Sequence, residues 1–201
     1  MNLNELYTIL YKYVADGTEK IPFAELMKGI YHDRGYLVAC NNHVLFVIHC
    51  APIYPHEKEG RIIDKKGNIL KNNDGSIPVY PNYQIVMPDP NEKANKALNK
   101  ADCKLVVNAC KKISNSEDSA KQLYIRIANV VDIDPKIIVD IAESFNLLGE
   151  EIEAALVYTE RDAQYRPVVF TSDSGRVVVM PHVNVESTLS VEDALEVGDL
   201  L

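Results

Sequence analysis

The chain has 201 residues, with 21 Lys or Arg against 29 Asp or Glu, so its formal net charge is −8. A chain of this length fits one domain or two small ones and needs no disulfide or metal to stabilise its core. The 47% hydrophobic residues argue against a disordered chain, and the charge balance excludes a protein that is basic throughout. Without a long apolar run or a secretory signal pattern, we expect a cytoplasmic protein with no membrane partner.

The first half of the chain changes from a helical to a strand pattern. Apolar residues at helical spacing predict a helix over residues 4–16. Residues 36–40 and 44–48 then read as strands joined by a tight turn at Asn41 and Asn42, a residue type that tolerates positive φ. Residues 51–79 are rich in Lys, Arg and turn residues, and we read them as an inserted hairpin loop.

The second half repeats this order. We expect a lysine-rich helix over residues 92–113, a strand over 122–131 and a helix that starts at Asp134 and Pro135 and stops at Gly149. Three short strands follow, over about 152–158, 167–171 and 176–181. Two rounds of a helix followed by antiparallel strands predict an α+β fold with duplicated units and the helices on one face. The expected organisation is a first half over 1–88, a second half over 89–185 and an acidic tail over 186–201.

A stripe of lysines is the first candidate functional feature. On a continuous helix the spacing would place five of them on one narrow face, which suits non-specific contact with the phosphate backbone of DNA. The ordinary alternative is the solvent face of an amphipathic helix, and Asp102 could instead cap a helix starting at Cys103, which would break the stripe. The candidate DNA-binding residues are Lys93, Lys96, Lys100, Lys104, Lys111 and Lys112.

The tail from Val177 onward holds no Lys or Arg, and its acidic residues are interleaved with apolar ones. It predicts either a solvated terminal helix or a segment that docks on this protein or on a partner.

The sequence gives no positive case for an enzyme. The four cysteines have no metal-binding spacing, and the five histidines have none either, so no metal or cofactor is expected. His49 is next to Cys50, but neighbouring residues on a strand point to opposite faces. No nucleophile, phosphate-loop or dinucleotide motif is present, so we predict no catalytic residues.

Three segments together resemble the bacterial DNA polymerase sliding clamp, the beta subunit. Gly35 to Leu45 is similar to the clamp's G-x-L-x-A-T-D-G-H-R-L hairpin, and Tyr80 to Pro88 is similar to its F-P-D-Y-x-x-V-L-P connector. Residues 166–181, which end in Met180 and Pro181, resemble the closing strand pair of the clamp.

In that family these segments form a hydrophobic cleft that captures short linear peptides of replication and repair proteins. The resemblance implies a partner-peptide cleft here, of the kind that an apolar hollow with a polar rim provides. Its residues would be Cys40, Asn42, His43, Val44, Leu45, Pro81, Val86, Val178, Met180 and Pro181. Cys40, Asn42 and Val44 replace the family's Thr, Gly and Arg, so the polar rim is altered.

The resemblance implies a DNA-clamp-like fold, shortened and divergent, with room for one clamp-type domain. We therefore predict a non-enzymatic sliding-clamp-like processivity factor, whose implied partners are double-stranded DNA and polymerase or repair proteins in DNA replication. The helices over 4–16 and 135–148, the expected channel pair, carry only Lys12 and Lys136, which argues against a working clamp. The alternative is a clamp-fold protein–protein interaction module without DNA binding. A ring of single-domain chains would be a homo-oligomer of about six copies.

Overall fold

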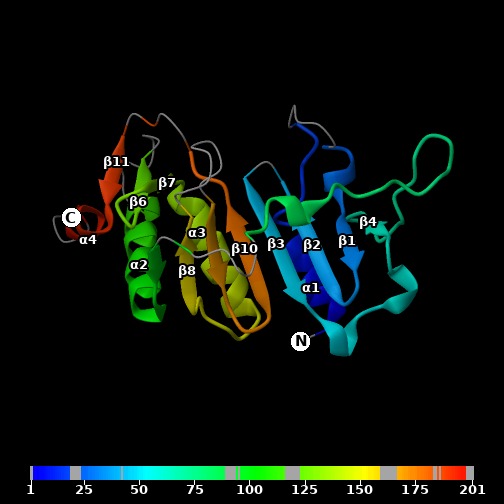
Figure 1. The fold of residues 1–201 in the computed structure, drawn as a ribbon, viewed down its shortest axis with the longest axis horizontal. Helices are drawn as coiled ribbons and strands as arrows, with labels where there is room; N and C mark the ends of the chain where they lie inside the picture. Colours follow the sequence, from blue (N-terminus) through cyan, green and yellow to red (C-terminus); the bar gives the residue numbers. More distant parts are fainter. Residues whose placement is uncertain are drawn as a thin grey trace. The chain divides into compact units, whose positions relative to one another are not determined.

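The computed structural model describes residues 2–18, 24–41, 43–88, 94, 96–115, 123–158, 167–182, 185 and 187–197. The chain divides into two compact units. Unit 1 comprises Met1–Asp89 with Ser174–Val178, and unit 2 comprises Pro90–Asp173 with Val179–Leu201 (Figure 1). Residues 174–178 return the chain to unit 1 late in the sequence.

Unit 1 packs one helix on a sheet. The helix α1 (Leu3–Leu10) begins with a capping box, because the Asn2 side chain accepts from the backbone N–H of Glu5 at 3.1 Å and Glu5 accepts from that of Asn2 at 2.8 Å. Its strands lie in the order β4, β1, β2, β3, β10. Their bounds are β1 (Ile30–Asp33), β2 (Tyr36–Cys40), β3 (Val44–His49), β4 (Ile62–Ile63) and β10 (Gly175–Val179), and short 3-10 helices are η1 (Leu26–Lys28), η2 (Ala51–Ile53), η3 (His56–Lys58) and η4 (Tyr83–Ile85).

Two predictions for unit 1 need correction. The first helix ends at Leu10 instead of residue 16: the N–H groups of Lys12 and Tyr13 bond carbonyl oxygens three residues back, and that of Ala15 bonds the carbonyl oxygen of Met27 at 2.9 Å. The segment 51–79 is more than a surface loop, because it contributes β4, which pairs antiparallel with β1. The hairpin of β2 and β3 is confirmed, with Cys40 opposite Leu45.

Unit 2 contains a helical layer and two groups of strands. Its helices are α2 (Lys100–Asn115), α3 (Pro135–Leu147) and α4 (Val191–Val197). The strand β8 (Ala154–Val157) pairs antiparallel with β5 (Lys96–Leu98) on one side and with β9 (Val168–Thr171) on the other. A separate sheet has the order β11 (Thr188–Ser190), β6 (Tyr124–Ile127), β7 (Val131–Ile133), with β11 parallel to β6.

The lysine-rich segment, predicted to be one helix over residues 92–113, is not a single helix. It contains β5 and then α2, because Asn99 starts a new helix as its N-cap. The Asn99 side chain accepts from the backbone N–H groups of Ala101 at 2.8 Å and Asp102 at 3.1 Å, and Asp102 accepts from the N–H of Asn99. The lysine stripe is therefore divided between a strand and a helix.

The strand expected over 122–131 is two strands, β6 and β7. Ala128 and Asn129 take left-handed backbone conformations, with φ of 52° and 58°, and this tight turn reverses the chain. The helix opened by Asp134 and ended near Gly149 is confirmed as α3, since Asp134 accepts from the N–H of Lys136 at 2.8 Å.

The acidic C-terminal segment is part of unit 2. The strand β11 extends the sheet beside β6, and α4 packs on α2 with Ala194 completely buried. The Lys112 ammonium donates to the carbonyl oxygen of Leu195 near the end of α4, at 2.6 Å. Of the two readings of the tail, docking on the protein's own body is the one that this packing shows. No helix among the described residues is long and apolar enough to cross a membrane.

Candidate functional site

The candidate site of unit 1 lies on the face of its sheet that is turned away from α1, which we call the outer face. The alternation of side chains along β1 separates the two faces. His32 points to α1, where its ring contacts Tyr7, so Tyr31 and Asp33 point to the outer face. Through the strand register, Val38 of β2 and its partner Val47 of β3 share the outer face.

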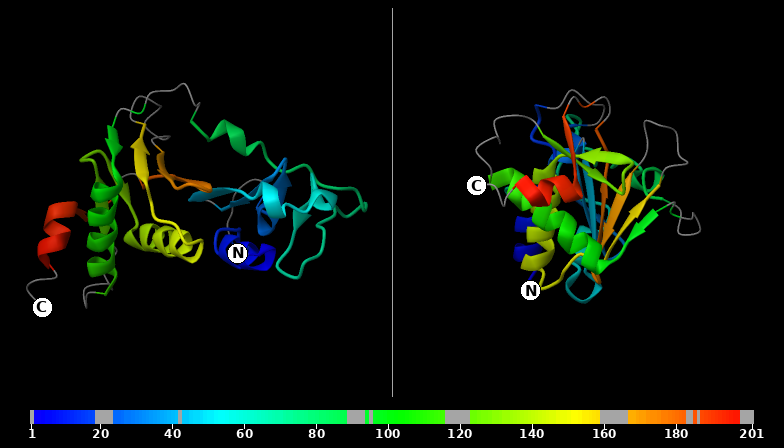
Figure 2. Two further views of the ribbon diagram at one scale, coloured as in Figure 1. Left: turned by 90° about the horizontal axis from the view of Figure 1, so that it is seen from below. Right: turned by 90° about the vertical axis from the view of Figure 1, so that its left-hand side faces the viewer.

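The segment 80–85 lies over this outer face, opposite α1 (Figure 2). The ring of Tyr80 stacks on that of Tyr31, with centroids 4.7 Å apart and planes at 3°. The hydroxyl of Tyr83 donates to the Asp33 carboxylate at 2.7 Å, and the Asn82 side chain caps η4 by accepting from the N–H of Gln84. Contacts to Tyr31 and Asp33, alternate residues of β1, thus fix the segment on the sheet.

A pocket of about 270 Å³ lies between β1 and this segment. Tyr80 is only 6% exposed, and its buried hydroxyl has no hydrogen-bond partner within the described part of the chain. Such an orphaned polar group is uncommon in a folded protein. The pocket is lined by Tyr31, Asp33, Arg34, Tyr80, Pro81, Asn82, Tyr83 and Gln84.

Arg34 is held at the mouth of the pocket by its backbone. It takes φ of 48° in the turn between β1 and β2, and its N–H donates to both carboxylate oxygens of Glu59, at 2.9 and 3.0 Å. Burial raises the pKa of Glu59, but hydrogen bonds from Tyr54 and Arg34 and the charge of Arg34 outweigh it, so the net pKa is lowered. The turn is therefore anchored by a carboxylate that is ionised at neutral pH.

The structure brings some of the expected cleft residues together. Cys40 and Leu45 lie opposite each other on the outer face, and Pro81 lines the pocket. Val44 is one position from Leu45 and lies on the α1 face, so it is separated from them. His43 is exposed in the turn, Val86 is half-buried after η4, and Val178 is buried in β10. Met180 and Pro181 are half-buried in unit 2, and Asn42 lies outside the described residues.

Sequence reasoning missed Tyr31, Asp33, Arg34 and Tyr83 as members of this site. The sign in the sequence was the tyrosine-rich segment 80–83, which resembles the clamp's connector but contributed only Pro81 to the expected cleft. Burial raises the pKa of the Cys40 thiol to about 12, so this cysteine stays protonated at neutral pH and is a poor nucleophile. Among the residues that the structure describes, no group of three or more His, Cys, Asp or Glu side chains could hold a metal ion.

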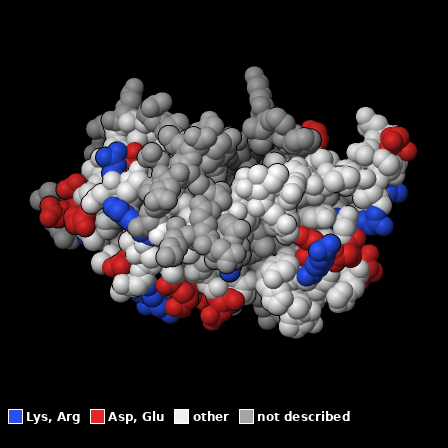
Figure 3. Space-filling view, in the orientation of Figure 1, with Lys and Arg blue, Asp and Glu red and all other residues white. Residues whose placement is uncertain are grey.

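The candidate DNA-binding lysines of unit 2 face acidic neighbours. The Lys100 ammonium lies 2.6 Å from Glu153 and 3.1 Å from Glu151, and Lys104 lies 3.2 Å from Glu151. Basic and acidic side chains therefore adjoin on this surface (Figure 3). Hydrogen bonds to Glu153 and then to Glu151 raise the pKa of Lys100, and hydrogen bonds from Lys100 and then from Lys104 lower the pKa of Glu151.

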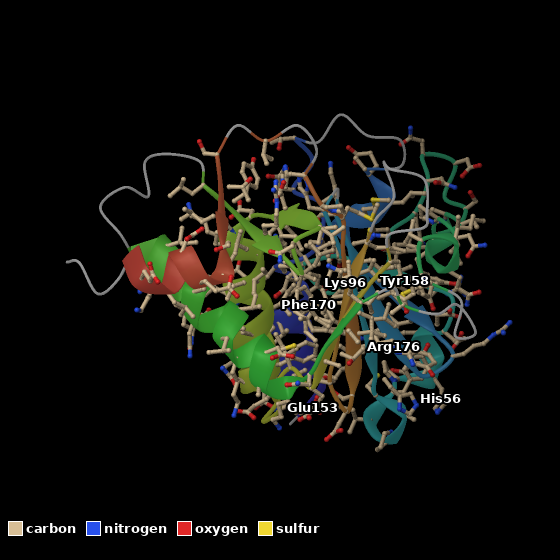
Figure 4. All side chains as sticks on the ribbon, turned by 60° about the vertical axis from the view of Figure 1, so that its left-hand side comes forward. His56, Lys96, Glu153, Tyr158, Phe170 and Arg176 are labelled. Carbon is tan, nitrogen blue, oxygen red and sulfur yellow. The ribbon has the colours of Figure 1, made fainter. Side chains whose placement is uncertain are left out.

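The other candidate lysines are dispersed. Lys96 lies on β5, at the end of the β5–β8 pair remote from Glu153 (Figure 4), and its ammonium donates to the carbonyl oxygen of Ala128 at 2.6 Å. Lys112 bonds α4, as described above. Lys111 is exposed and lines a hollow of about 220 Å³ between α2 and α3, together with Lys104. Lys93 lies outside the described residues.

The two units differ in net charge. Unit 1 contains ten basic and ten acidic residues, whereas unit 2 contains 11 basic and 19 acidic residues. The whole formal charge of −8 therefore resides in unit 2, the unit that carries the lysine stripe. A negative unit repels phosphate at long range, so only a local basic surface could offset this repulsion.

Comparison with solved structures shows that the fold is that of bacterial DNA polymerase sliding clamps. Similar structures include the DnaN sliding clamp of Bartonella birtlesii bound to griselimycin, with a TM-score of 0.58, 15% identity and coverage of 91% of this chain and 64% of that chain. A DNA polymerase sliding clamp of Pseudomonas aeruginosa has a TM-score of 0.57 and 12% identity, with coverage of 89% of this chain and 64% of that chain. The pol III beta of Caulobacter crescentus has a TM-score of 0.56 and 14% identity, with coverage of 91% of this chain and 64% of that chain. No protein-family model and no curated protein sequence matches the chain.

The chain spans a little under two thirds of the clamp chains it matches. The α+β, clamp-like fold class is confirmed.

Proposed function

We propose that this chain is a non-enzymatic clamp-fold protein that tethers a replication or repair partner by binding a short linear peptide on the outer face of unit 1. The observation that carries the proposal is the pocket under residues 80–84, with its stacked tyrosines and an unpartnered hydroxyl. The similar solved structures, which are DNA polymerase clamps, support the class of partner.

Exposed apolar side chains next to the pocket support a docking role. Val79 is 86% exposed and Ile85 is 74% exposed, on the segment that carries the pocket. Large apolar side chains beside a polar hollow are what a peptide needs for anchoring and orientation. Unit 1 is neutral overall, so an approaching peptide meets no strong repulsion there.

The test is selection of peptides from a displayed random library on the full chain, followed by fluorescence anisotropy. Ile85→Asp should weaken a selected peptide at least tenfold. The matched control is Leu147→Asp, another exposed apolar residue, 63% exposed on α3, which should bind the peptide as the wild type does. Failure to select any peptide, or equal binding by both variants, would contradict the proposal. Both substitutions lie at the surface and should leave the fold intact.

A second candidate function is sequence-independent binding of double-stranded DNA. The observation that favours it is the presence of Lys104 and Lys111 on one hollow of α2, two helical turns apart. The double variant Lys104→Glu, Lys111→Glu should lose salt-sensitive DNA retention if these residues hold phosphates. Lys136→Glu, an exposed lysine of α3, is the control with one charge reversed. Unchanged retention by the double variant would rule out this lysine surface.

Encirclement of DNA would in addition require assembly into a closed ring. A ring of copies should appear in light scattering as a fixed multiple of the 22.5 kDa chain. A mass of 22.5 kDa at all tested concentrations would exclude a self-assembled ring and would be consistent with the peptide-binding module alone.

A further inference from the structure

We propose that the pocket of unit 1 receives a basic side chain, and arginine in particular, from the peptide bound on the outer face. This inference rests on the proposed function, because it names the residue that anchors that peptide. It follows from the charges, the hydrogen-bonding groups and the aromatic rings that surround the pocket.

The charges around the pocket leave one carboxylate without a cationic partner. Arg34 and Glu59 face each other, since the N–H of Arg34 donates to that carboxylate and the two charges interact. Asp33 accepts the Tyr83 hydroxyl at 2.7 Å, and within the described part of the chain it forms no ion pair. An acidic or neutral ligand would leave Asp33 uncompensated, whereas a cation would pair with it.

The remaining groups of the pocket can accept several hydrogen bonds. Besides the Asp33 carboxylate, Gln84 lines the wall with a side-chain amide, and Tyr83 contributes a phenol oxygen that already donates its proton to Asp33. A guanidinium has five N–H donors in one plane, so it can donate to the Asp33 carboxylate, the Tyr83 phenol oxygen and the Gln84 amide oxygen together. An ammonium is a compact point charge that matches such a set less well. This difference favours arginine over lysine.

The aromatic rings add a second form of recognition. Tyr31 is half-buried with Tyr80 stacked on it, and Tyr83 is beside them. A guanidinium can stack on such a ring as well as be attracted by its π-face. A volume of about 270 Å³ has room for one long side chain. Unit 1 has no net charge, so a basic partner meets no long-range repulsion from it.

The experiment is a titration of the full, isotope-labelled chain followed by amide NMR shifts, with N-acetyl-arginine amide as the probe. The neutral probe of the same shape is N-acetyl-citrulline amide. We expect saturable shifts at residues 31–35 and 80–84 with a millimolar Kd for the arginine probe, and at least fivefold weaker binding of the citrulline probe. Equal shifts with both probes, or no saturable shift, would overturn the proposal.

Variants assign the charge. Asp33→Asn should weaken the arginine probe at least fivefold, and Arg34→Ala should tighten it about twofold because a repelling cation is removed. Glu25→Gln, an exposed acid of the same unit, should have no effect. Tyr83→Phe removes the hydrogen bond to Asp33 but keeps the charge of Asp33. Retained binding of the arginine probe by this variant would show that the charge of Asp33, and not its hydrogen bond to Tyr83, attracts the probe. Unchanged binding by Asp33→Asn, or weaker binding by Arg34→Ala, would contradict the assignment.

The two proposals fail in different ways. Selected peptides that bind the outer face but contain no basic residue, and that ignore Asp33→Asn, would preserve the tethering function and refute the arginine anchor. A bound arginine probe without any selectable peptide would preserve the pocket's specificity and refute peptide tethering.

Discussion

The hydroxyl oxygen of Tyr7 lies 2.9 Å from Nε2 of His32, which is fully buried beneath α1. The Lys58 ammonium donates to the same hydroxyl oxygen at 3.3 Å. Nδ1 is buried and has no hydrogen-bond partner among the described residues. The arrangement therefore holds His32 neutral and leaves no acceptor for a second ring proton.

This arrangement predicts that unit 1 loses stability in mild acid. Burial, and then the charge of Lys58, lower the pKa of His32 to about 4, from 6.5. Because the unfolded chain binds the proton more readily, stability should fall as the pH drops from about 6.5 towards 4 and then level off with respect to this group. The loss is of the order of 3 kcal/mol. Urea unfolding measured against pH should show this slope, and His32→Gln should abolish it. A His32→Gln curve parallel to the wild-type curve would refute the assignment.

Gly29 predicts a second, steric sensitivity in unit 1. A Cβ at this position would lie 2.7 Å from Cγ2 of Ile62 and 2.7 Å from the carbonyl oxygen of Ile63, so the backbone of β4 would have to move. Gly29→Ala should destabilise the protein by about 2 kcal/mol. The lower entropy of the unfolded variant would act the other way, by about 0.4–1 kcal/mol. Urea unfolding measures the change in stability. An unchanged or raised unfolding midpoint would show that β4 moves aside at little cost.

The docked C-terminal segment predicts a local response in unit 2. Ala194 is completely buried where α4 packs on α2, and the backbone N–H of Tyr124 donates to the carbonyl oxygen of Ser187 at 3.1 Å. Ala194→Asp would bury a charge and should release α4 and β11 together. The amide of Tyr124 should then exchange its hydrogen at least tenfold faster, because its acceptor belongs to the released segment. Glu192→Asp, an exposed change on the same helix, is the control, and slow exchange in both variants would contradict this coupling.

The acidic neighbours of the lysine stripe predict the effect of removing them. The paired side chains are 43–57% exposed, so Glu151→Gln with Glu153→Gln should leave the stability close to that of the wild type. If Lys100 and Lys104 contact DNA, the same double variant should increase DNA retention at low salt, and this gain should vanish at high salt. DNA retention at the wild-type level would show that Lys100 and Lys104 form ion pairs within unit 2 and do not contact DNA.

The elements with strong local patterns were predictable from sequence, and the site was not. Asp134 and Gly149 mark the ends of α3 because a capping side chain and a left-handed glycine act within a few residues. Asn99 was missed as a cap, since apolar and lysine spacing continue across it and mimic one helix. The pocket joins Asp33 to Tyr83 across 50 positions of sequence, and only the folded sheet brings these side chains together.

The resemblance to sliding clamps selected cleft residues by their position in a motif. It named Val44 beside Leu45, although alternation along β3 sends them to opposite faces of the sheet. It also passed over Arg34, whose place depends on a left-handed turn and on Glu59, 25 residues away. Of the residues that line the pocket, the positional resemblance named only Pro81.

Hydrogen exchange of the whole chain, with and without a library-selected peptide, tests peptide capture on the outer face most directly. Our account predicts that protection on binding is confined to unit 1, in β1, β2 and residues 80–86, and that Ile85→Asp removes it. Protection centred on α2 or α3 of unit 2, or a bound peptide that protects no amide of residues 80–86, would contradict the account.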